Sequence, residues 1–147
     1  MWPPIRELDM KSEHRTLWLR AAFTMALAGC EEATGVVECT TESIAVEVVP
    51  AHNPAFEWAP ACGMASLEVR PAAGGPGGWV IYTGSHASEN PLHSGIRYGN
   101  APALAVEPIP ATPLAAGSIY TVTLWRGISD GHGGASLFIA GSTTFQQ

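Results

Sequence analysis

The sequence lacks any apolar run long enough to cross a bilayer as a helix, which takes roughly 20 residues. Residues 21–29 form a charge-free stretch of nine, and nine helical residues cover only about 14 Å. Five basic side chains lie within residues 1–20, before this stretch. A basic region followed by a short apolar one predicts an export signal over residues 1–29, starting at Met1 or Met10.

Basic side chains are also scarce after the leader. From Cys30 onward there are ten acids, three arginines and no lysine, a net charge of about −7. Such a surface repels phosphate backbones and anionic lipid headgroups. We therefore expect no nucleic-acid partner and no electrostatic attachment to a membrane.

Motifs of known enzymes are missing too: there is no HExxH, GxSxG or P-loop pattern. We assign no catalytic residue, metal ligand or cofactor. Two groups of polar residues leave an alternative open, because His86 and His93 share a loop with Glu89, and Asp130 lies two residues from His132. If these loops met, they could hold a metal ion.

The cysteine that follows the apolar stretch has a characteristic setting. Leu27-Ala28-Gly29-Cys30 resembles the lipobox of bacterial lipoproteins, in which the cysteine is acylated with diacylglycerol and becomes the new N-terminus after cleavage. The resemblance implies lipid attachment at Cys30, a tether over residues 30–42, and an outer-membrane location because Glu31 follows. In the alternative reading, residues 26–28 are an ordinary A-x-A cleavage site and Cys30 is a plain cysteine.

The cysteine count favours acylation. Three cysteines, Cys30, Cys39 and Cys62, leave one thiol over in an oxidising compartment. Once Cys30 is acylated, Cys39 and Cys62 can form a disulfide that stabilises the fold by roughly 3 kcal/mol. A buried pair of free thiols is the alternative.

Period-2 alternation of apolar residues recurs along the rest of the chain, whereas helical spacing does not. The alternating segments are residues 44–48, 56–58, 67–69, 96–98 and 120–124, with an apolar run at 79–82 that predicts a central strand and a closing strand within 136–145. Turn residues separate them at 50–54, 71–78, 83–95, 108–113 and 129–134. About seven short strands predict an all-β sandwich or barrel.

Two motifs favour the sandwich. Leu114, Gly117 and Tyr120, leading into an alternating strand, resemble the E–F corner of fibronectin type III domains, where the tyrosine hydroxyl bonds back to the corner backbone. Trp58 with Pro60 two residues later is similar to strand B of the same domains. The resemblance covers residues 44–145 but does not extend to 79–102, and it implies a fibronectin type III-like (Ig-like) antiparallel β-sandwich over 43–147.

This topology predicts where the ends of the sandwich lie. If residues 43–49 and 55–59 are antiparallel neighbours, Cys39 and Cys62 meet at one end, together with the loop at 129–134. The loops around His52, at 74–78 and around Ala111 then lie at the opposite, lipid-distal end, where we expect a partner to bind. Alternation places Trp125 on the outer face. There it is either an ordinary half-covered residue of the sheet, the reading we favour, or part of an exposed patch for a protein or glycan.

Together these observations predict a non-enzymatic, lipid-anchored cell-envelope protein whose sandwich is an interaction or structural module. Its partners would be the membrane, through the lipid on Cys30, and an envelope protein or glycan. The alternative is a periplasmic metal-binding protein or hydrolase with a site built from the histidine-bearing loops.

Overall fold

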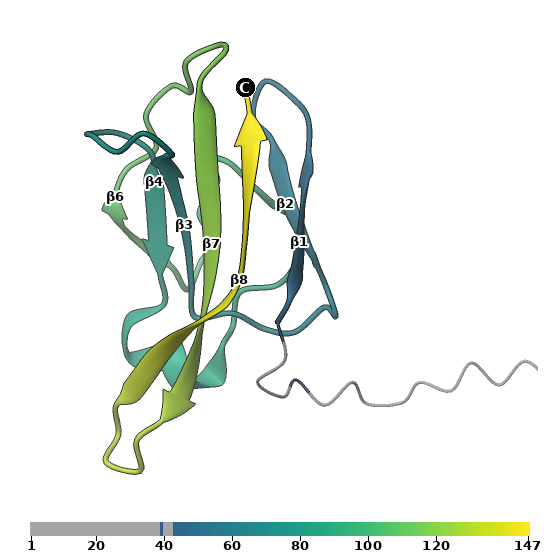
Figure 1. Ribbon diagram of the computed structural model, residues 1–147. Coiled ribbons are helices and arrows are strands. Elements are labelled where there is room, and N and C mark those ends of the chain that lie inside the picture. The colour runs from purple at the N-terminus through teal and green to yellow at the C-terminus, as the bar shows by residue number, and fades with distance from the viewer. Residues whose placement is uncertain (1–38, 40–42) are drawn as a thin grey trace, which may run out of the picture. The chain divides into compact units, whose positions relative to one another are not determined.

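A computed structural model describes Cys39 and residues 43–147, which form strands joined by short connections (Figure 1). The strands are β1 (Ala45–Val49), β2 (Ala55–Ala59), β3 (Ser66–Pro71), β4 (Trp79–Tyr82), β5 (Ile96–Arg97), β6 (Val106–Ile109), β7 (Ile119–Ser129) and β8 (Ala135–Gln146). One short 3₁₀ helix, η1 (Gly84–Glu89), follows β4. In this part of the chain, no helix is long and apolar enough to span a membrane.

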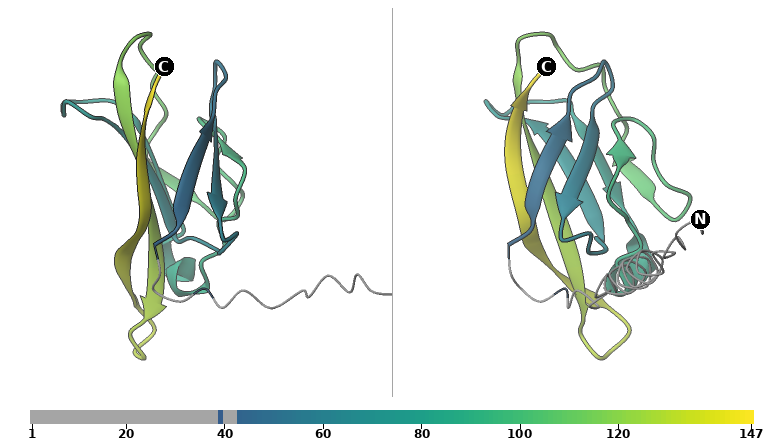
Figure 2. Two further views of the ribbon diagram at one scale, coloured as in Figure 1. Left: turned by 45° about the vertical axis from the view of Figure 1, so that its right-hand side comes forward. Right: turned by 90° about the vertical axis from the view of Figure 1, so that its right-hand side faces the viewer.

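The strands form two antiparallel sheets that lie face to face (Figure 2). The smaller sheet has the order β1-β2-β5, and the larger has the order β6-β4-β3-β7-β8. Buried side chains from both sheets form one core cluster. The predicted all-β class is therefore confirmed, with two packed antiparallel sheets.

The alternation in the sequence places apolar side chains in this core. In β2, Phe56 and Trp58 are buried while Glu57 between them is exposed. In β7, Val122 and Leu124 are fully buried on either side of the half-buried Thr123. Successive strand residues point to opposite faces, so each such strand presents one face to the core. Burying each large apolar side chain stabilises the fold by roughly 1.5–3 kcal/mol.

Aromatic contacts join the two sheets. Phe145 of β8 lies with its ring centroid 5.8 Å from that of Phe56 in the smaller sheet and 5.7 Å from that of Tyr120. Near the other edge, Trp79 and Tyr98 meet edge to face at 5.4 Å. Such pairs contribute about 0.5–1.5 kcal/mol beyond burial.

Strand β6 differs from the prediction of a turn at residues 108–113, because Pro108 and Ile109 belong to this strand. Residues Val106–Ile109 pair with β4 through Val80↔Ile109 and Tyr82↔Val106, with an irregularity between the two pairs. Proline is compatible with an edge strand because the missing N–H is not needed on the open side. The predicted turn at 83–95 likewise contains η1.

Strand β4 also differs in part from the prediction. It lies between two other strands, as a central strand does, but only Trp79 and Ile81 are buried, and Val80 and Tyr82 are half buried. The apolar composition of β4 therefore serves the core on one face and forms part of the outer surface on the other.

The segment after η1 is fixed to β7 by one asparagine. The side chain of Asn90 accepts a hydrogen bond from the N–H of Gly127 at 2.7 Å and donates one to its carbonyl at 2.9 Å. Gly127 pairs with Leu137 of β8 on its other side. The first residue of β3, Ser66, pairs with Trp125, so β3 does not reach Gly127. The Asn90 amide therefore satisfies the backbone N–H and carbonyl of Gly127 in place of a neighbouring strand.

Candidate functional site

The cysteines lie where the sequence predicted. Cys39 and Cys62 have their Sγ atoms 1.97 Å apart, at disulfide distance. The carbonyl of Cys62 accepts a buried hydrogen bond from Trp58 Nε1 at 2.7 Å, and that of Cys39 accepts one from the Arg126 guanidinium. These contacts attach the segment before β1 to both sheets. Cys30, the predicted lipid attachment site, and the signal segment lie outside the described residues.

The loop at 129–134 lies at this same end, as predicted, because it joins β7 to β8 beyond the start of β3 (Figure 1). Asp130 Oδ1 accepts hydrogen bonds from the backbone N–H groups of His132 at 2.8 Å and Gly134 at 2.9 Å. These N–H groups lower the pKa of the Asp130 carboxyl below its usual value. The carboxylate thus organises the turn of the hairpin.

The polar groups considered for the alternative metal site do not gather in the structure. In η1, His86 Nδ1 lies 3.3 Å from Glu89 Oε1, and both side chains are exposed. Within Cys39 and residues 43–147, no three His, Cys, Asp or Glu side chains are grouped closely enough to hold a metal ion. His52 lies apart from the others, in the turn between β1 and β2.

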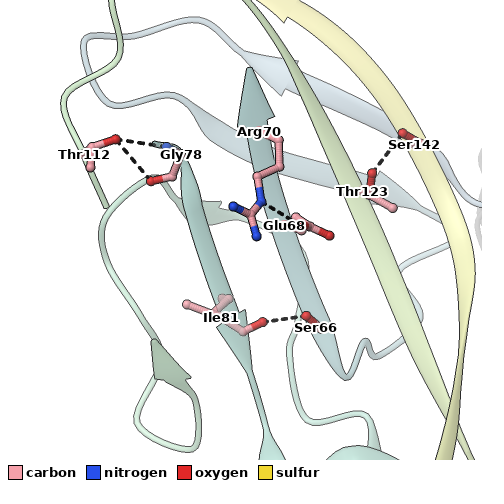
Figure 3. A network of polar contacts seen from close by, with 8 residues as sticks. All are labelled: Ser66, Glu68, Arg70, Gly78, Ile81, Thr112, Thr123 and Ser142. Atoms are coloured by element: carbon pink, nitrogen blue, oxygen red, sulfur yellow. Dashed lines mark hydrogen bonds and ion pairs between the residues drawn. The ribbon is translucent and has the colours of Figure 1, made fainter. Parts of the chain in front are cut away.

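The opposite end of the sandwich is formed by the β1–β2 turn, the β3–β4 loop and the connection from β6 to β7 (Figures 1 and 2). This distal end has its own hydrogen bonds. Thr112 Oγ1 accepts from Gly78 N at 3.0 Å (Figure 3). The backbone N–H of Thr112 donates to Gly78 O at 3.1 Å. The Tyr98 hydroxyl donates to the Thr112 carbonyl at 2.7 Å, and burial raises the pKa of Tyr98.

The corner before β7 closes the distal end. The hydroxyl of Tyr120 accepts a hydrogen bond from the backbone N–H of Ala115 at 2.8 Å, while its ring is buried. This is the contact that the sequence predicted for the tyrosine. Gly117, in the left-handed region at φ 77°, makes the turn between them.

Two hollows flank His52 at the distal end. One, of about 380 Å³, lies between the β1–β2 turn and the end of β8 and is lined by Val48, Pro50, Ala51, His52, Pro54, Phe145, Gln146 and Gln147. The other, of about 290 Å³, lies beside the β6–β7 connection and is lined by His52, Asn53, Tyr98, Gly99, Ala111, Thr112, Pro113 and Leu114. Both combine apolar side chains with backbone carbonyls and amide or hydroxyl groups, which suits a neutral ligand or a peptide segment.

The sequence indicated His52 and Ala111 as distal, but it did not indicate that Gln147 would join them. Gln147 Nε2 donates to the carbonyls of His52 at 3.3 Å and Ala51 at 3.4 Å. The carbonyl of Gln147 accepts from Gly117 N at 2.7 Å. Only the pairing of β7 with β8 brings this residue to the distal loops.

Trp125 lies on the outer face of the larger sheet, as predicted, and it is half buried, as the favoured reading of a half-covered sheet residue expects. No protein-family model, curated protein or solved structure matches the chain.

Proposed function

We propose that this protein is a non-enzymatic, lipid-anchored module of the bacterial cell envelope, with a fibronectin type III-like sandwich that binds a partner at its distal end. The observation that carries the proposal is the cysteine arrangement. Cys39 and Cys62 lie at disulfide distance, so the third cysteine, Cys30 of the lipobox-like Leu27-Ala28-Gly29-Cys30, is the one left for acylation.

The type of sandwich is supported by strand order and by the tyrosine corner. The orders β1-β2-β5 and β4-β3-β7-β8 correspond to strands A-B-E and C′-C-F-G of a fibronectin type III domain. Tyr120 bonds back to Ala115 at the corner before the seventh strand. Strand β6 has no counterpart in this set of seven strands and is added at the edge of the larger sheet beside β4. The tyrosine corner therefore follows β6, a strand of the larger sheet.

The position of the anchor supports binding at the distal end. Cys39 lies beside Cys62 at the end where β2 finishes, whereas the hollows flanking His52 lie at the other end of the strands. A tether that leaves from the disulfide end presents the distal loops away from the bilayer. Two or three acyl chains hold firmly where one gives only marginal binding.

The test is to determine what is attached to Cys30. We expect an alkyne-labelled fatty acid to be incorporated into the wild-type protein and not into Cys30→Ala, and mass spectrometry to find a diacylglyceryl thioether on an N-terminal Cys30. The matched control, Cys39→Ala/Cys62→Ala, keeps Cys30 and should still be labelled. A mature N-terminus at another residue, or a bare Cys30 thiol in membrane-derived protein, would refute the anchor.

Binding at the distal end has a separate test. Hydrogen exchange of the membrane-bound protein in envelope extract should show protection at residues 50–54 and 110–118. Protection confined to residues 129–134 would place the partner at the disulfide end and would refute binding at the distal end.

A further inference from the structure

The outer face of the larger sheet contains a row of side chains that crosses all five strands. Direct pairing aligns Val106 with Tyr82, Tyr82 with Ser66, Ser66 with Trp125 and Trp125 with Ile139. Residues directly opposite one another share a face, with Cβ atoms about 5 Å apart. Tyr82 and Trp125 therefore stand on either side of a single small residue.

Ser66 forms the floor between the two aromatic side chains. Its hydroxyl donates to the carbonyl of Ile81 at 2.7 Å within the sheet (Figure 3), and it is only 6% exposed although it points outward. A shallow hollow of about 290 Å³ lies here, close to the lower limit of roughly 300 Å³ for small-molecule sites. Its lining consists of Ser66, Glu68, Val80, Tyr82, Pro108, Trp125 and Leu137.

A row of polar side chains lies next to the row that contains Tyr82 and Trp125. Glu68 pairs with Val80 on one side and with Thr123 on the other, and Thr123 pairs with Ser142. The hydroxyls of Thr123 and Ser142 lie 3.3 Å apart (Figure 3). A ligand lying over Ser66 therefore contacts the aromatic rings of Tyr82 and Trp125 with one part of its surface. Another part lies beside the Glu68 carboxylate and the hydroxyls of Thr123 and Ser142.

The charge of this face indicates a neutral ligand. Glu68 Oε1 accepts from Arg70 Nε at 2.7 Å (Figure 3), so the carboxylate and the guanidinium neutralise each other. The exposed pair Glu47 and Glu57 belongs to the smaller sheet. A nucleobase could also stack on the rings, but a nucleic acid needs cations for its phosphates, and Arg70 is already paired.

We propose that the hollow between Tyr82 and Trp125 binds a neutral glycan. A pyranose ring has an apolar C–H face that stacks on an indole or phenol ring, and hydroxyl groups around its edge that bond to carboxylates and hydroxyls. The aromatic row beside Glu68, Thr123 and Ser142 offers both kinds of contact on rigid paired strands. The row spans four inter-strand steps of about 4.8 Å, so the ligand is an oligosaccharide of several units lying across the strands. The site does not depend on acylation of Cys30 or on binding at the distal end.

The experiment is titration calorimetry of the full chain with cellohexaose, chitohexaose, maltohexaose and soluble mannan. A zwitterionic detergent without a sugar headgroup is required, since an alkyl maltoside would compete. We expect at least one of these glycans to bind, and Trp125→Leu to weaken that binding by about tenfold because it keeps apolar bulk but removes the stacking ring. The matched control is Ile119→Ala, which removes a 54% exposed side chain from the same strand and should leave the affinity unchanged.

Tyr82→Leu provides an independent variant in case Trp125→Leu does not fold, as judged by circular dichroism, and it should weaken binding in the same way. If none of the four glycans binds at millimolar concentration, or if neither variant changes the affinity, the proposal is wrong. Self-association that is lost in Trp125→Leu, in the absence of glycan binding, would instead identify this face as a protein interface and would also overturn it.

Discussion

Removing both cysteines of the disulfide should lower the stability of the sandwich by an amount that the loop length sets. Cys39 and Cys62 are 23 positions apart, and closing a loop of that size in the unfolded chain corresponds to about 3.4 kcal/mol at 25 °C. For a domain of this size, with an m-value of about 1.5 kcal/mol/M, the urea midpoint should fall by about 2 M in Cys39→Ala/Cys62→Ala. The measurement is equilibrium urea unfolding followed by near-ultraviolet circular dichroism, in a Cys30→Ser background.

Packing and cross-linking can be separated in the same experiment. Cys62 is 1% exposed, so alanine also leaves a small cavity, whereas chemical reduction keeps both sulfur atoms in place. We expect the reduced Cys30→Ser protein, which keeps Cys39 and Cys62, to lose most of the ~3.4 kcal/mol. The Cys39→Ala/Cys62→Ala variant should lose slightly more and should be insensitive to reductant. A midpoint that moves by less than about 0.5 M in both cases would refute the pairing or the unfolded-state reasoning behind it.

Three further outcomes follow from single contacts. Tyr120→Phe removes the acceptor of the 2.8 Å bond from Ala115 N. The free energy of unfolding should fall by about 1 kcal/mol, measured by urea unfolding with an unchanged m-value. No loss of stability would mean that water fully replaces the hydroxyl. Asn90→Ala should lower the free energy of unfolding by about 2 kcal/mol, because both hydrogen bonds to Gly127 are lost. Asn90→Gly adopts the left-handed φ of 51° more readily, so it should recover the cost of the backbone conformation but not that of the two hydrogen bonds. Burial raises the pKa of Tyr98 above 10.0, so this tyrosine ionises at a lower pH in the unfolded state than in the folded state. Stability should therefore be constant at neutral pH and should fall as the pH rises above about 10. An equal fall of the urea midpoint between about pH 9 and 11 in Tyr98→Phe would contradict this.

The strand pattern and the corner were predictable from the sequence because both are local signals. Period-2 alternation in residues such as Phe56, Glu57 and Trp58 directly reports which side of a strand is buried. The corner motif from Leu114 to Tyr120 spans only a few residues, so its hydrogen bond forms within one segment. The cysteine pairing was also predictable, since it needed only two antiparallel neighbours joined by a short turn.

Other features depend on contacts that no local pattern contains. Val106–Ile109 became a strand because β4 offered an open edge, although Pro108 favours a turn. Gly127 must lack a side chain because the carbonyl of Ala87 lies where a Cβ atom would stand, and nothing near Gly127 in the sequence indicates this. Likewise, His52 and Gln147 share a hollow only because β1 and β8 end at the same side of the sandwich.

The sequence by itself therefore determined the class of fold, the faces of most strands, the cysteine pair and the expectation of a lipid on Cys30. The tertiary structure decided the order of strands in each sheet, and with it the row in which Tyr82, Ser66 and Trp125 become neighbours. The physical reason is that alternation records only whether a side chain faces inward or outward. Which strands lie side by side is decided by long-range hydrogen bonding and packing, which join residues as distant as Ser66 and Trp125.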